Sequence, residues 1–403
     1  MSGTRARGEH PADGRPTTVV LGAGYAGVMA ANRLAGGDRR VIVVNPVDVF
    51  VERIRLHELV AGSRASAVRP LPTLLAPGVE LRVGEAARID ADARLVRLHG
   101  GARLGYDELV YAVGSGSSPD RAAGEHAVSS LEDAVRLRAA LDVAPPRTRV
   151  VVLGAGLTGV ETAAEIAEAR SGLDVELRTR GALVPGTGPG ARRAMRASLA
   201  RLGVRVVEHA RETRDLVGPG VVVVHATGFA VPGLAVESGL PVDASGRLVV
   251  GPDLRVEGRP GILGAGDAVV VGGVRNAALR MSCAAALPQG ATAADVLLGR
   301  AARLDAGFVA QCASLGRASA SVQLVRADDS PRAAHLTGRP AAAVKELICR
   351  QTLRWLRDEG RRPGSYSWVR GPRIGSADGG LPGAAASLGG PAAEVALGGR
   401  GGR

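Results

Sequence analysis

Two glycine fingerprints constrain the fold of this chain more than any other feature. The first reads Gly22-Ala-Gly24-Tyr-Ala-Gly27, and the second reads Gly154-Ala-Gly156-Leu-Thr-Gly159. In such a motif the first glycine permits a tight turn, the second lets the backbone approach a pyrophosphate, and the third lets helix and strand pack closely. The helix that follows offers free N–H groups to the phosphates. One copy can arise by chance among 57 glycines, but two copies, each between an apolar strand and an alanine-rich helix, predict two dinucleotide sites.

Strands and helices are expected to alternate along the chain. Strands are predicted at residues 18–21, 41–44, 108–113, 149–153, 174–178, 220–226 and 318–326, with a further block at 261–271. Helices are predicted at residues 25–34, 131–141, 159–170 and 341–357. This alternation predicts an α/β fold, with parallel sheets covered by helices on both faces.

The composition excludes several classes of protein. The formal charge is +12, but Lys345 is the only lysine among 51 basic residues, so GC-rich coding explains the excess as well as a basic surface does. Because only 2% of the residues are aromatic, we expect no nucleic-acid partner. Cys283, Cys312 and Cys349 form no C-x-x-C pair, which argues against a disulfide framework or a metal site and suits a reducing cytoplasm. No signal peptide or spanning helix is expected.

Five motifs follow one another in an order that is more specific than any one of them. They are GAGYAG at 22–27, LVYAVGS at 109–115, GAGLTGVE at 154–161, HATGF at 225–229 and GILGAGDAV at 261–269. On these motifs the chain resembles the two-dinucleotide-binding-domain flavoproteins of the pyridine nucleotide-disulfide oxidoreductase-like superfamily. Within them it resembles most closely the FAD-containing type II NADH dehydrogenases.

The resemblance implies two Rossmann-like dinucleotide-binding domains, the second inserted in the first, and a C-terminal α/β extension. The implied parts are an FAD-binding domain at 17–118 and 240–300, an NAD(P)H-binding domain at 119–239, and a C-terminal interface or acceptor region at 301–370. Residues 1–16 and 371–403 are rich in small and polar residues, and we expect them to be a disordered arm and tail.

The resemblance also assigns site residues. The acid at Glu161 matches a family acid near the junction of flavin and nicotinamide and is the candidate catalytic residue. Residues 50–62 occupy the position where the family wraps chain beside the flavin ring. The candidate cofactor-binding residues are Gly22, Gly24, Tyr25, Ala26, Gly27, Asn45, Arg55, Val83, Ala112, Gly114, Gly154, Gly156, Gly159, Arg178, Arg180, Gly228, Gly266 and Asp267.

Simpler interpretations of these residues stay open beside the functional ones. The glycines could form ordinary turns, although their repetition in the same context favours binding. Asp267 could be a helix N-cap, a role compatible with contact to the cofactor, which we favour. Glu161 could serve only to complement a helix dipole, and neither interpretation is preferred. For His57 and His225 we favour structural roles.

Two positions depart from the family pattern at the nucleotide sites. Asn45 stands where the family usually has an acid that binds the adenosine ribose, and an amide can replace that contact more weakly. Thr179 stands where an NADH-selective enzyme would have its acid, and it lies between Arg178 and Arg180. Missing negative charge and two guanidinium groups suit a 2′-phosphate, so we predict tolerance of NADPH. Arginine is common throughout this chain, which is the alternative explanation.

The electron acceptor is less constrained. A glutamine-containing stretch that type II dehydrogenases place beside the quinone corresponds to residues 283–290, where only Gln289 and Gly290 match. Ala284 and Pro288 replace the two glutamines. Helix 341–357 has an apolar face with Val344 and Leu347. It could lie on an anionic membrane or dock onto its own sheet, and we favour docking.

These observations predict an FAD-dependent NAD(P)H oxidoreductase that passes electrons to a quinone or another acceptor. Alternatives are a reductase of a small electron-transfer protein and a redox-sensing flavoprotein module with little turnover. We expect a cytoplasmic protein, with peripheral contact at the inner face of the cell membrane and a homodimer as open possibilities. No cysteine lies at 50–62, which argues against disulfide reduction beside the flavin.

Overall fold

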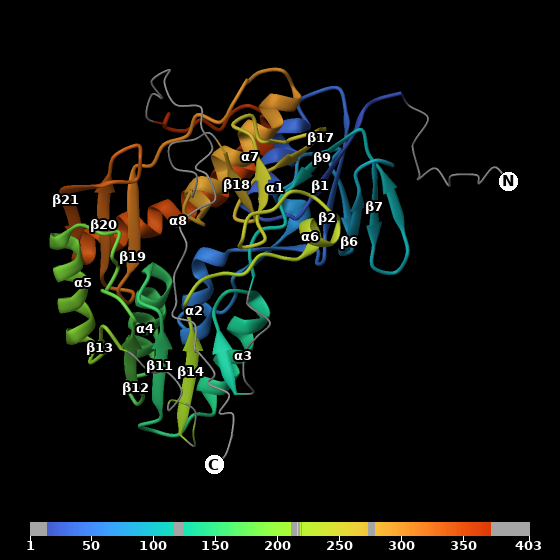
Figure 1. The fold of residues 1–403 in the computed structure, drawn as a ribbon. Helices are drawn as coiled ribbons and strands as arrows, with labels where there is room; N and C mark the ends of the chain where they lie inside the picture. Colours follow the sequence, from blue (N-terminus) through green and yellow to red (C-terminus); the bar gives the residue numbers. More distant parts are fainter. Residues whose placement is uncertain are drawn as a thin grey trace, which may run out of the picture.

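The first fingerprint lies at the centre of a six-stranded sheet with the order β16-β17-β9-β1-β2-β5. Its strands are β1 (Thr17–Leu21), β2 (Arg40–Asn45), β5 (Glu80–Val83), β9 (Glu108–Tyr111), β16 (Arg255–Val256) and β17 (Arg259–Gly264). All neighbouring strands are parallel except β16 and β17. Helices α1 (Tyr25–Leu34) and α7 (Cys283–Leu297) pack against each other beside this sheet (Figure 1). All five residues of β1 are buried, as expected for a central parallel strand.

The second fingerprint lies in a five-stranded parallel sheet with the order β10-β14-β11-β12-β13. Its strands are β10 (Glu125–Ala127), β11 (Arg149–Leu153), β12 (Asp174–Arg178), β13 (Arg205–Val207) and β14 (Val221–His225). Its helices are α3 (Leu131–Asp142), α4 (Leu157–Ala169) and α5 (Pro189–Arg201). Each of the two parallel sheets has its own large apolar core. The expected α/β fold with Rossmann-like sheets is confirmed.

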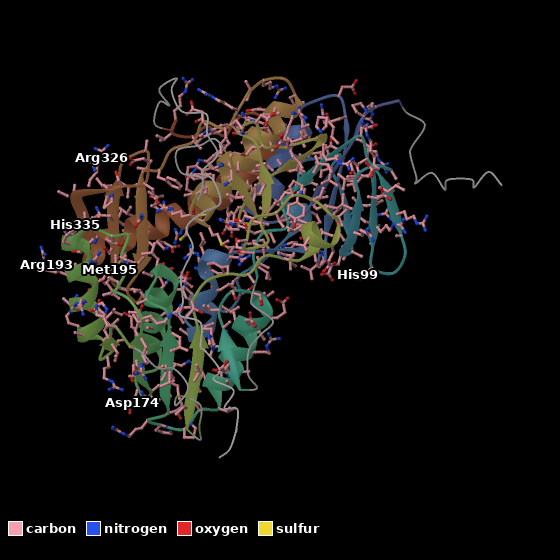
Figure 2. All side chains as sticks on the ribbon, in the orientation of Figure 1. His99, Asp174, Arg193, Met195, Arg326 and His335 are labelled. Atoms are coloured by element: carbon pink, nitrogen blue, oxygen red, sulfur yellow. The ribbon has the colours of Figure 1, made fainter. Side chains whose placement is uncertain are left out.

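A third unit consists of the antiparallel sheet β19 (Ala310–Ser314), β20 (Ala320–Val325) and β21 (Pro331–Thr337), followed by α8 (Gly338–Arg361). In Figure 2, His335 of β21 lies beside Arg193 and Met195 of α5.

Helix α8 packs on β20 and reaches α1 with its second half. Docking onto its own sheet is therefore confirmed, although Leu347 is 63% exposed and lies outside the buried face. No helix in the described part of the chain is long and apolar enough to span a membrane.

The computed structural model describes residues 14–116, 124–210, 216, 218, 220–272 and 279–371. Most of the predicted arm and tail lies outside these residues. The smaller elements are β3 (Val49–Val51), a 3₁₀ turn (Arg53–Arg55), α2 (Leu56–Ala61), β4 (Val68–Pro70), a second 3₁₀ turn (Leu71–Thr73), β6 (Ala86–Asp90), β7 (Leu95–Leu98), β8 (Arg103–Gly105), α6 (Leu234–Glu237), β15 (Leu248–Val250) and β18 (Val269–Val271).

Candidate functional site

The first fingerprint turns from β1 into α1 with almost no free space around two of its glycines. Gly22 has a φ of +97°, and a Cβ added there would lie 2.3 Å from the carbonyl oxygen of Ala112. A Cβ added at Gly27 would lie 1.9 Å from the oxygen of Gly22. A Cβ added at Gly24 would meet no atom within 4 Å. The protein's own packing therefore explains the first and third glycines, whereas the second leaves open space above the backbone.

The second fingerprint repeats this pattern between β11 and α4. Gly154 has a φ of +100°, and its added Cβ would lie 2.4 Å from the oxygen of Ala226. The Cβ at Gly159 would lie 1.8 Å from the oxygen of Gly154, and the Cβ at Gly156 would meet nothing within 4 Å. Both helices start at the open glycine, and neither has a side-chain cap. Their first N–H groups are thus available to an anion above the turn.

Asn45 supports the first turn from the end of β2. Its Oδ1 accepts a hydrogen bond from the N–H of Ala23 at 2.9 Å, and its Nδ2 donates to the oxygen of Val47 at 2.7 Å. Val83 is paired with Asn45 across the parallel strands and is 55% exposed at the sheet edge. Asn45 therefore holds the glycine turn in place, a role that the sequence did not indicate.

A cavity of about 290 Å³ lies where the three units meet. Eight of the predicted site residues line it: Gly24, Tyr25, Ala26, Ala112, Gly114, Glu161, Gly266 and Asp267. The third unit contributes a further wall through β19 and α8, including Gln311, Cys312, Lys345, Ile348 and Cys349. The cavity thus connects the start of α1, the start of α4 and the C-terminal unit.

Glu161 forms a buried ion pair in the cavity wall. Its Oε1 accepts hydrogen bonds from Lys345 Nζ at 2.7 Å and from the N–H of Ser314 at 3.0 Å. Burial would raise the pKa of Glu161, but the charge of Lys345 and the nearby His57 hold the pKa below its usual value. Burial would lower the pKa of Lys345, but the charge of Glu161 holds the pKa of Lys345 above its usual value. The only lysine of the chain is therefore held in its charged form beside the candidate catalytic acid.

Asp267 lines the cavity at the end of β17. Its Oδ2 accepts a hydrogen bond from Ser115 Oγ at 2.8 Å. The segment after it forms strand β18 rather than a helix, so the interpretation of Asp267 as a helix N-cap is wrong. The adjacent Gly266 donates its N–H to Gln289 Oε1 at 2.9 Å. Gln289 and its neighbour Gly290, whose added Cβ would lie 2.2 Å from the oxygen of Ala26, fix α7 against the first turn.

Arg55 does not reach this cavity. It is 3% exposed, and its guanidinium contacts Glu58 Oε1 at 2.9 Å and Glu346 Oε2 at 2.5 Å. Two carboxylates already satisfy its charge, so we assign Arg55 a structural role in joining α2 to α8. From the same segment Arg53 and His57 line the cavity instead. The two arginines differ in which way the 3₁₀ turn directs them, and the contacts of Arg55 do not support its predicted role in cofactor binding.

The remaining predicted residues lie around the end of the second sheet. Arg178 Nε lies 3.2 Å from Oε1 of the buried Glu176, so part of its charge is already compensated. Arg180 is exposed in the loop after β12. Gly228 has a φ of +134° and is exposed, and the next residue, Phe229, lines the cavity. None of these three residues lines the cavity. Of the two arginines, Arg180 is the more accessible to a ligand.

All three cysteines line the same cavity, although they are far apart in the sequence. Burial raises the pKa of Cys283 to about 11 and also raises the pKa of Cys312 and of Cys349. The thiols are therefore protonated near neutral pH and are poor nucleophiles. No group of three metal-binding side chains is found among the described residues.

The two histidines differ in their surroundings. His57 is 4% exposed, its Nε2 has no hydrogen-bond partner in the structure, and burial lowers its pKa. His225 Nε2 lies 3.0 Å from Glu125 Oε2 on the neighbouring strand, and its side chain is 28% exposed. His225 is thus a partly buried, paired residue rather than a fully packed one.

Comparisons with known proteins agree with this architecture. The family model described as pyridine nucleotide-disulphide oxidoreductase matches residues 16–290. An NADH dehydrogenase-like protein of Mycobacterium tuberculosis is 37% identical over 166 residues, which cover 37% of this chain and 41% of the relative. The type II NADH:quinone oxidoreductase NdhA of the same organism is 26% identical over 318 residues, 65% of this chain and 68% of that protein.

The solved structures agree on the fold. The structure of NDH2 from Plasmodium falciparum in complex with NADH has a TM-score of 0.72 at 14% identity. It covers 87% of this chain, and the match takes in 99% of that structure. At this identity the likeness concerns the fold alone.

Proposed function

The chain belongs to the pyridine nucleotide-disulphide oxidoreductase family, and from that premise we propose that it is an FAD-dependent NAD(P)H dehydrogenase with a quinone as acceptor. The family binds FAD and uses NAD(P)H. The observation that carries the proposal is the repeated steric pattern of the fingerprints. In each fingerprint the middle glycine has free space above it, and the first and third glycines have none. The helices that follow both start at the same cavity. Two dinucleotides bound there would meet with their reactive ends inside it.

The residues of the first turn fit FAD. Gly24, Tyr25 and Ala26 present the start of α1 to the cavity, where N–H groups would hold the pyrophosphate. Asp267, fixed by Ser115, would accept hydrogen bonds from hydroxyl groups of the cofactor. When bound, FAD supplies the redox chemistry, taking two electrons from NAD(P)H and passing them to the acceptor.

The start of α4 would hold the NAD(P)H pyrophosphate over Gly156, and Glu161 lies one turn further along the same helix. Lys345 keeps Glu161 ionised, and the protonated Nζ offers a hydrogen-bond donor in the cavity wall. A quinone oxygen placed at this wall would accept that hydrogen bond. The wall is otherwise largely apolar, with Ile348 and Ala284 among its residues, which suits a planar apolar acceptor.

Arg180→Ala should lower kcat/KM with NADPH about tenfold, roughly 1.4 kcal/mol, and should leave kcat/KM with NADH nearly unchanged. Arg180 is exposed, whereas Arg178 is paired with the buried carboxylate of Glu176. The guanidinium of Arg180 can therefore contact a 2′-phosphate. Steady-state kinetics with both nucleotides measure the effect, and Arg193→Ala on α5, also an exposed arginine, is the control. A wild-type enzyme that prefers NADH by several orders of magnitude would contradict the prediction.

The proposed function is tested on the purified full chain. Its absorption spectrum should show bound flavin, and stopped-flow mixing with NADH or NADPH should bleach that flavin rapidly. Oxidation of the nucleotide should then proceed with quinones more readily than with a small acidic ferredoxin. Turnover with the ferredoxin alone would favour a carrier reductase, and slow bleaching with no turnover would favour a redox-sensing module. Peripheral membrane contact and a homodimer are not addressed by this experiment.

A further inference from the structure

Arg53 is a cation of the cavity wall that has no ion-pair partner among the residues that the structure describes. Its Nη1 donates a hydrogen bond to the backbone oxygen of Ser115, and its Nη2 donates to the oxygen of Ser129 at 2.8 Å. Its guanidinium also lies over the ring of Phe229, 5.5 Å from the centroid. Arg53 therefore contacts both connections between the two parallel sheets, which pair with each other at Gly116 and Ala230.

The other cations that line the cavity have carboxylate partners. Lys345 Nζ lies 2.7 Å from Glu161, and Arg280 Nη1 lies 3.0 Å from Asp329 Oδ1. Within the described ranges, no carboxylate oxygen lies within ion-pair distance of Arg53. Asp267 attracts it electrostatically, but the Asp267 carboxylate takes its hydrogen bond from the hydroxyl of Ser115.

Neutral carbonyl oxygens and an aromatic face satisfy the N–H groups of Arg53 but do not neutralise its charge. A partly buried cation without a direct ion pair is costly, and a ligand that brings negative charge to it lowers that cost. Burial lowers the pKa of Arg53, which agrees with poor compensation by solvent. Arg53 contacts the connections between the first and second halves rather than either glycine turn, so a ligand charge that meets it would lie where the two cofactors approach each other.

We propose that Arg53 stabilises the negative charge that a bound flavin acquires on reduction, and so raises its reduction potential. This inference rests on the proposed function, since it requires flavin in the cavity. Two electrons delivered with one proton leave the ring with an added negative charge, and a fixed cation nearby favours that state over the oxidised one. Arg53 acts here through its charge, whereas the lysine at 345 acts on the acceptor side.

The test compares the midpoint potential of flavin in the full-length wild type, Arg53→Met and Arg53→Lys. At a fixed potential, the ratio of reduced to oxidised flavin should fall at least about tenfold in Arg53→Met, a shift of about 30 mV for a two-electron couple. Arg53→Lys keeps the charge and should stay close to the wild type. Phe229→Leu removes the ring under the guanidinium but leaves the charge, so its potential should also be close to the wild type.

The outcomes separate the inference from the function on which it rests. A wild-type protein that binds no flavin overturns both. If the wild type binds flavin and Arg53→Met has the same midpoint potential, the inference alone is overturned. It is also overturned if Arg53→Met and Arg53→Lys shift the midpoint potential equally, because that result would indicate a purely structural role for Arg53. Should Arg53→Met fail to fold or to keep flavin, Arg53→Gln retains N–H donors for both carbonyl oxygens and must still lower the potential.

Discussion

Gly24→Ala should weaken the retention of flavin without unfolding the chain, whereas Gly27→Ala should destabilise its first half. The added methyl group at Gly24 enters open space where a ligand must approach, so we expect flavin affinity to fall at least about tenfold, or 1.4 kcal/mol. At Gly27 the methyl group would lie 1.9 Å from a backbone oxygen that cannot move away freely. That overlap should cost about 1–3 kcal/mol or more. Flavin absorbance after gel filtration and urea denaturation measure the two effects.

The second fingerprint provides a matched control in the same molecule. Gly156→Ala should weaken the binding of NADH and NADPH while flavin stays bound, and Gly159→Ala should destabilise the second sheet through a contact of 1.8 Å. Equal effects of Gly24→Ala and Gly156→Ala on flavin content would contradict the assignment of one dinucleotide to each turn. Unfolding by Gly24→Ala would contradict the interpretation that its space belongs to a ligand.

Lys345→Met should destabilise the protein by about 3–5 kcal/mol at neutral pH, because it leaves the buried carboxylate of Glu161 unpaired. Turnover should be lost as well. In the wild type the pKa of Glu161 lies below its usual value, so the pair stabilises the protein at pH above the unfolded pKa and loses that contribution as pH falls through the folded pKa. Without Lys345, burial raises the pKa of Glu161, and the carboxyl group takes up a proton more easily.

The deficit of Lys345→Met should therefore be largest near pH 7.5 and should shrink toward pH 5.5 in urea denaturation experiments. The double variant Glu161→Gln with Lys345→Met removes both charges and should recover much of the stability, with activity still absent. A deficit that is independent of pH, or a double variant as unstable as the sum of the single ones, would show that the ion pair does not govern the effect.

The elements that the sequence predicted well are those that a short segment specifies by itself. The strands at 149–153 and 174–178 match β11 and β12 residue for residue. The first has the apolar β-branched run VVV before Gly154, and the second, DVELR, alternates polar and apolar residues. Helix α5 was missed although Ala191, Met195 and Leu199 recur every four residues and are buried. Its many arginines and its glycine-rich start masked that period.

The contacts between distant parts of the site could not be predicted from local patterns. The pairing of Glu161 with Lys345 spans 184 positions, and nothing near either residue indicates the other. The choice between Arg53 and Arg55 depends on the course of a 3₁₀ turn, which places one in the cavity wall and the other against Glu346. The cysteines have no common motif, yet β19, α7 and α8 bring them to one cavity.

Helix α8 has a mechanical consequence for how ligands enter and leave. Its 24 residues give the helix a length of about 36 Å. In its first third, Lys345 is bound to Glu161 of α4 in the second half, and near its C-terminal end Glu359 accepts a hydrogen bond from Arg33 of α1 in the first half at 3.2 Å. A wide separation of the halves would have to break one of these buried anchors. Nucleotide and acceptor should therefore exchange through the mouth of the cavity while the halves keep a fixed spacing, and turnover should depend little on solvent viscosity.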